Sequence, residues 1–190
     1  MRRMILVLTG VMILSGLVLA ATYTGVTDRI EANRIAALNA SLAAILPGRN
    51  LTFETLDADG PAIYRAMEAG EVLGYAIRVQ TQGYGGTITM LVGISRDLDE
   101  ILGLEIVEQI ETPGLGGRIR EQAFRGQFAG LDPDESVSYV RNVQPNPDEN
   151  EIQAITGATI TSRAVVVGIN AALDRVLQTI RRTDREWQAL

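Results

Sequence analysis

The apolar residues at the start of the chain form one uninterrupted block. No charged residue lies between positions 4 and 27, and Arg2 and Arg3 precede the block. A helix over residues 4–23, rising about 1.5 Å per residue, would span roughly 30 Å, the hydrocarbon thickness of a bilayer. The pattern therefore predicts an N-terminal transmembrane anchor over residues 1–26 and a separate domain over residues 27–190.

A cleaved signal peptide is the alternative interpretation of this block. The segment 18–20 ends in Ala and fits a cleavage site, but the apolar block is longer than the usual hydrophobic region of about 7–15 residues. We therefore favour a retained, single-pass anchor in the cytoplasmic (inner) membrane, in contact with membrane lipid. The paired arginines favour a cytoplasmic N-terminus, which puts the domain on the periplasmic, extracytoplasmic side.

The periodicity after the anchor predicts helices at the two ends of the domain and strands between them. Apolar residues at three- and four-residue spacing predict helices over 28–46, with Asp28 as N-cap, and over 163–182. A short helix is expected over 118–128, with Ile119, Ala123 and Phe124 on one face. The predicted strands are residues 51–56, 63–67, 72–80, 87–95, 101–107 and 137–143, and a polar loop is expected over 144–150. This order indicates an α+β domain with an antiparallel meander.

Composition removes several kinds of chemistry. The chain has 17 basic and 23 acidic residues, a net charge of −6, and every basic residue is Arg. It has no Cys and no His, so disulfides, iron–sulfur clusters, ordinary zinc sites and His-dependent catalysis are excluded. The acidic balance argues against nucleic acid as a partner. Any redox chemistry would need an organic cofactor.

A cluster of hydroxyl residues, TGATITS at 156–162, precedes the last predicted helix. Thr161 or Ser162 would cap that helix and Gly157 would ease the turn. Alternatively, the small residues would let backbone N–H groups approach a phosphate at the positive end of the helix. Both interpretations fit this string by itself.

A glycine-rich segment, ETPGLGG at 111–117, follows the predicted meander. It is either a Pro-Gly turn or a place where the backbone approaches a flat ligand closely. Together with TGATITSRAV and with GYGGTITMLVGIS at 83–95, it resembles the FMN-binding G subunit of the Rnf electron transport complex. The C subunit of the sodium-pumping NADH:quinone reductase is a longer relative of that family.

The resemblance implies an FMN-binding domain with an antiparallel sheet and flanking helices. It also implies a membrane-anchored flavoprotein that relays electrons within an ion-translocating ferredoxin:NAD oxidoreductase, next to other membrane subunits. In that family FMN is covalently attached as a phosphoester to the last Thr of the string, here Thr159, by a flavin transferase that takes FMN from FAD. The ETPGLG loop lies beside the isoalloxazine ring, which would place Thr112, Leu115 and Gly116 there.

Two charged residues near the motifs have alternative roles. Arg163 would pair with the phosphate or would be a solvated helix residue, and Glu111 would hold the loop against the ring or would be an exposed turn carboxylate. The remaining residues expected to bind the cofactor are Thr156, Gly157, Ala158, Thr161 and Ser162.

The chain departs from the family pattern at two positions. Gln153 stands where the family has an Asp that helps transferase recognition, and Gln109 stands where a His is common. Two alternatives therefore stay open: an exported FMN protein of another respiratory chain, and an anchored scaffold that has lost its flavin.

Overall fold

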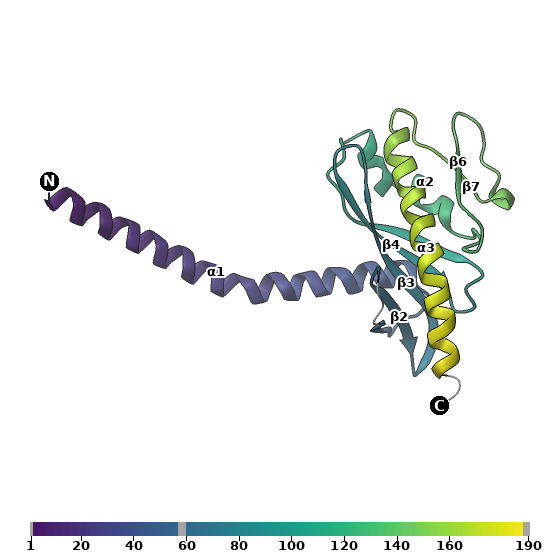
Figure 1. The fold of residues 1–190 in the computed structure, drawn as a ribbon, viewed down its shortest axis with the longest axis horizontal. Helices are drawn as coiled ribbons and strands as arrows, with labels where there is room; N and C mark the ends of the chain where they lie inside the picture. Colours follow the sequence, from purple (N-terminus) through teal and green to yellow (C-terminus); the bar gives the residue numbers. More distant parts are fainter. Residues whose placement is uncertain (1, 57–59, 188–190) are drawn as a thin grey trace. The chain divides into compact units, whose positions relative to one another are not determined.

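The computed structural model describes residues 2–56 and 60–187 and divides the chain into two compact units, Met1–Asn39 and Ala40–Leu190. The first unit is part of helix α1 (Arg2–Ile45) (Figure 1). Its segment Arg2–Ala20 has a mean hydropathy of 2.2 and is, among the described residues, the one helix long and apolar enough to cross a membrane. The expected helix start at Asp28 is wrong, because α1 continues through this position: no Pro interrupts it, and a single Gly such as Gly25 costs only about 1 kcal/mol.

The second unit contains the predicted antiparallel meander. Its five strands are β1 (Thr52–Leu56), β2 (Ile63–Glu68), β3 (Glu71–Gln82), β4 (Thr87–Ser95) and β5 (Ile101–Glu108). They lie in sequence order, and every neighbouring pair is antiparallel. The β2–β3 turn contains Ala69 and Gly70, both with positive φ, at 53° and 87°. The regular spacing of the strand-like segments and the turn residues thus predicted the sheet correctly.

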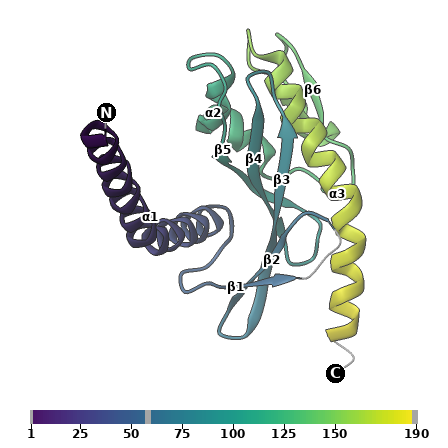
Figure 2. The same ribbon diagram turned by 60° about the vertical axis from the view of Figure 1, so that its left-hand side comes forward.

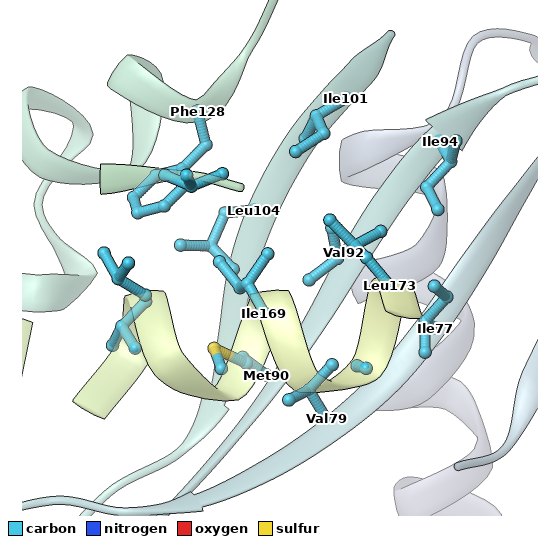
Figure 3. Close-up of a cluster of buried hydrophobic side chains, with 14 of the residues drawn as sticks. Ile77, Val79, Met90, Val92, Ile94, Ile101, Leu104, Phe128, Ile169 and Leu173 are labelled. Atoms are coloured by element: carbon cyan, nitrogen blue, oxygen red, sulfur yellow. The ribbon is translucent and has the colours of Figure 1, made fainter. Parts of the chain in front are cut away.

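Helix α3 (Thr159–Trp187) crosses one face of this sheet and closes the main core (Figure 2). Its buried stripe includes Ile169 and Leu173, which lie against Val79, Met90 and Val92 of the sheet (Figure 3). The helix comes very close to β3, because a Cβ at Gly168 would lie 2.9 Å from the Cβ of Thr81. The Thr81 hydroxyl also donates to the Ala164 carbonyl, at 3.1 Å, and so fixes the helix along the strand.

The opposite face of the sheet receives the last turn of α1. Leu42, Ile45 and Leu46 are buried there. Glycines in the strands make the contact possible: a Cβ at Gly93 would lie 2.8 Å from the Ile45 carbonyl oxygen, and one at Gly74 would lie 3.2 Å from Leu46. Glycine within a strand often marks such a close approach.

The segment after β5 is more irregular than predicted. The single helix expected over 118–128 is wrong. In its place are η1 (Gly116–Arg120), α2 (Gln122–Arg125) and η2 (Gly126–Phe128), because Glu121 is extended with ψ 142°. Ile119 and Phe124 are buried as expected, but Ala123 is exposed and Phe128 fills the core in its place.

The last predicted strand is shorter than expected and has an unforeseen partner. It is reduced to β6 (Ser138–Val140), which pairs in parallel with β7 (Glu151–Gln153). The polar loop between them contains a single 3₁₀ turn, η3 (Pro147–Glu149). The cap prediction for the last helix is also wrong, since α3 already begins at Thr159 and both Thr161 and Ser162 lie inside its first turn.

Replacement of a core residue of α3 tests how strongly the helix supports the sheet. We expect Ile169→Ala to lower the free energy of unfolding by about 2–5 kcal/mol, because it empties a fully buried position. Val167→Ala is the matched control on the same helix, where the side chain is 52% exposed and the loss should stay below about 0.5 kcal/mol. Urea unfolding of the full chain in detergent, followed by circular dichroism, measures both values. Equal effects of the two substitutions would contradict the packing described above.

Candidate functional site

A cavity of about 460 Å³ lies between the β3–β4 turn, the loop after β5 and the start of α3. Its volume falls in the range of about 300–1,000 Å³ typical of small-molecule sites. The residues that line it are Tyr84, Glu111, Thr112, Leu115, Gly116, Gly157, Ala158, Thr159, Ile160 and Thr161. Both motifs singled out in the sequence therefore meet at one cavity.

Glu111 connects the three segments that form the cavity. Its side chain is only 5% exposed. Oε1 accepts the backbone N–H of Gly85 in the β3–β4 turn at 2.8 Å, and Oε2 accepts the hydroxyl of Thr161 in α3 at 2.8 Å. The alternative of an exposed turn carboxylate is therefore wrong, and the expectation that Glu111 holds the loop against a ring stays a prediction.

Two glycines make room for this carboxylate. A Cβ at Gly116 would lie 2.4 Å from Oε2 of Glu111, and a Cβ at Gly83 would lie 2.3 Å from Oε1. The loop closes on itself as well, since the Thr112 carbonyl accepts the N–H groups of Leu115 and Gly117 at 3.2 and 3.0 Å, around Gly114 with φ 75°. Glycine is required at position 116 for space and at position 114 for conformation.

The four hydroxyls of the 156–162 string have different environments. Ser162 is fully buried; its Oγ accepts the N–H of Ile155 at 3.0 Å and donates to the Ala158 carbonyl at 3.1 Å. Thr161 donates to Glu111, and Thr156 lines a separate polar pocket of about 170 Å³. Thr159 lines the main cavity, is partly buried, and has no hydrogen-bond partner for its hydroxyl among the described residues. Of the four, only the Thr159 hydroxyl is both uncommitted and inside the cavity.

The exposed side chains that line the cavity are mainly apolar. Tyr84 is 72% exposed, Ile160 59% and Leu115 46%. Tyr84 and Ile160 were not among the residues predicted to bind a cofactor, because the first lies in a glycine-rich turn and the second lies within the helix-start motif. An aromatic residue within a Gly-Tyr-Gly-Gly turn was the signal that would have marked Tyr84 as a ligand-facing residue.

Three of the sequence-predicted residues are not part of the cavity wall. Arg163 is exposed, Thr156 faces the smaller pocket, and Ser162 has the structural role described above.

Gln109 and Gln153, the two glutamines that depart from the family pattern, are hydrogen-bonded to backbone groups. The Gln109 Oε1 accepts the N–H of Glu111 at 2.5 Å, and the Gln153 Nε2 donates to the Val143 carbonyl at 3.3 Å.

Comparisons with known proteins agree with this geometry. The family model described as an FMN-binding domain matches residues 83–174, which include every residue that lines the cavity. The fold is similar to that of the C subunit of the Na(+)-translocating NADH-quinone reductase from Parabacteroides distasonis, with a TM-score of 0.58 and 20% identity over 75% of this chain and 81% of that chain. Fold and site thus define an FMN-binding domain that follows a helix of membrane-spanning length.

Curated relatives identify the family within this class. The G subunit of a proton-translocating ferredoxin:NAD(+) oxidoreductase complex from Clostridium ljungdahlii is 31% identical, over 86% of this chain and 84% of that protein. The G subunit of an ion-translocating oxidoreductase complex from Methanosarcina acetivorans is 33% identical, over 83% of this chain and 85% of that protein. The chain belongs to the G-subunit family of ion-translocating (Rnf-type) oxidoreductase complexes, which confirms the resemblance seen in the motifs.

The space reserved for the Glu111 carboxylate gives a stability prediction. We expect Gly116→Ala to lower the free energy of unfolding by about 1–3 kcal/mol, because the new methyl group overlaps Oε2 of Glu111 and Oγ1 of Thr161. Gly117→Ala is the matched control, since its Cβ would meet nothing nearer than 3.3 Å. Chemical unfolding of the two variants in parallel measures the difference. A neutral Gly116→Ala would show that the carboxylate is not held where we place it.

Proposed function

We propose that this chain is the membrane-anchored flavoprotein subunit of an Rnf-type complex and relays electrons through FMN joined to Thr159. The observation that carries the proposal is the uncommitted Thr159 hydroxyl within a cavity of small-molecule size. The family match to an FMN-binding domain supports FMN as the cofactor. Membership of the G-subunit family supports other membrane subunits as partners.

The residues around the cavity fit the parts of FMN. Tyr84, Leu115 and Ile160 provide apolar surface for a flat ring system. The start of α3 at Thr159 provides backbone N–H groups and the positive end of a helix for the phosphate. Gly157, with φ 81°, allows the sharp turn that leads into this helix. When bound, the flavin would supply reversible uptake of electrons, while the chain supplies its position and its electrostatic surroundings.

We propose that attachment is covalent and is made by a flavin transferase with FAD as donor. The Thr159 Oγ–P bond forms, the bond from that phosphorus to AMP breaks, and the hydroxyl proton leaves. The bound phosphate would lie at the N-terminus of α3. Arg163 is exposed and outside the cavity wall, so its pairing with this phosphate stays a prediction.

The location of the domain is part of the same proposal. The apolar segment Arg2–Ala20 supports a single-pass membrane protein. Arg2 and Arg3 at its start favour a cytoplasmic N-terminus and an extracytoplasmic FMN-binding domain. The proposed domain boundary after residue 26 lies within the continuous helix α1.

Removal of one hydroxyl tests the attachment site. We expect Thr159→Ala to abolish the fluorescent band of the denatured protein under ultraviolet light, because a covalent flavin survives denaturation on the chain and a non-covalent one does not. Thr156→Ala should keep full fluorescence, since Thr156 faces the smaller pocket. Intact mass spectrometry of protein from cells with an active transferase gives the same comparison independently. Fluorescence that persists in Thr159→Ala rejects the site, and a dark wild-type band favours the flavin-free scaffold.

Protease treatment tests the orientation. In intact right-side-out membranes, a protease added outside should remove the domain, and in inverted vesicles the domain should be protected. Immunoblotting with an antibody against the C-terminal part of the chain measures both. The opposite pattern of protection would place the domain in the cytoplasm.

A further inference from the structure

The Glu111 carboxylate is a buried charge in the wall of the cavity, and no described side chain supplies a cation to it. It lines the cavity although it is only 5% exposed. Among the described side chains, the ion pairs are Arg65–Glu54, Arg118–Glu121, Arg125–Glu105 and Arg181–Asp134, and none includes Glu111. Both carboxylate oxygens accept hydrogen bonds, one from a backbone N–H and one from a hydroxyl, so these partners are dipoles.

Such a charge opposes the arrival of a second negative charge nearby. Two like charges repel each other more strongly at the low effective dielectric constant of a protein site than they do in water. Reduction of a flavin adds one negative charge for each electron that no proton accompanies. We propose that Glu111 is the residue that sets the reduction potential of the FMN, and that its charge holds this potential low. The proposal rests on the proposed FMN site.

The structure keeps this carboxylate in position from several sides. Gly83 and Gly116 leave the space that its two oxygens fill, and Gly85 and Thr161 donate to them. If Glu111 only held the cavity wall in place, any side chain that makes the same two hydrogen bonds would do the same. If Glu111 lowers the reduction potential of the FMN, its negative charge is required. A neutral side chain of equal size therefore separates the two roles.

The variant Glu111→Gln makes this separation. Its Oε1 still accepts from Gly85, and its amide N–H donates to the Thr161 oxygen, so both contacts are kept while the charge is lost. Glu108→Gln is the matched control, because it removes an equal charge from an exposed side chain at the end of β5. Full-length protein from a host with an active transferase is titrated with dithionite and redox mediators, and the flavin absorbance reports the oxidised and reduced fractions.

We expect Glu111→Gln to raise the midpoint potential, with at least about a tenfold shift in the ratio of reduced to oxidised flavin at a fixed applied potential; tenfold is about 59 mV for a one-electron step. Glu108→Gln should shift the ratio less than about twofold, and added salt should screen that shift away. An unchanged potential in folded, flavin-loaded Glu111→Gln overturns the proposal.

A second variant keeps the charge and removes a hydrogen bond. Thr161→Val leaves the carboxylate with fewer partners, so the potential should stay the same or fall. A rise similar to that of Glu111→Gln would mean that disruption of the wall, and not loss of charge, moves the potential, and would also overturn the proposal. Denaturing-gel fluorescence is recorded for every sample. A wild-type protein without flavin fails the proposed function itself, whereas loaded protein with an unmoved potential fails only this inference.

Discussion

The cavity of this protein depends on one buried carboxylate that joins three distant parts of the chain. Glu111 binds Gly85, 26 residues away, and Thr161, 50 residues away. Burial of a carboxylate costs free energy, and its hydrogen bonds offset that cost. If either partner were lost, the carboxylate would stay buried with less compensation, so both contacts are needed. The glycines of the β3–β4 turn and of the loop after β5 follow from this requirement, because any side chain at position 83 or 116 would occupy the place of its oxygens.

The sequence predicted the regular part of the fold well and the irregular part poorly, for a physical reason. Strands β3 and β4 are long enough for their apolar pattern to identify them, and the turn between them has three glycines among its four residues. Strands β6 and β7 have three residues each, which is too few for an apolar period to be visible. They pair in parallel, so no tight turn between them marks their position in the sequence. The helix expected over 118–128 fails at Glu121, whose extended backbone has no signature in the sequence.

The candidate site, too, was predictable where it depends on local sequence and not where it depends on contacts between distant segments. The two motifs were identifiable because glycines and hydroxyls gathered at fixed positions, and the structure brings those positions to one cavity. The residues of the string do not by themselves show which hydroxyl is free, because the answer depends on partners such as the Ile155 N–H and the Glu111 carboxylate. Only the family resemblance pointed to Thr159. The contribution of Tyr84 also depends on the β3–β4 turn lying next to the start of α3, a relation between segments far apart in the chain.

The glycine-lined face of the sheet has a consequence for the order of folding. Ile45 leaves the ribosome well before Gly93 and Gly103, the strand glycines that it packs against, and Leu46 leaves before Gly74. This short apolar stretch therefore stays uncovered while some fifty further residues, including β4, are synthesised, and an unfinished chain exposes it during that interval. Exposed apolar surface of this kind favours aggregation, so completion of β4 and β5 removes a hazard at the beginning of the domain.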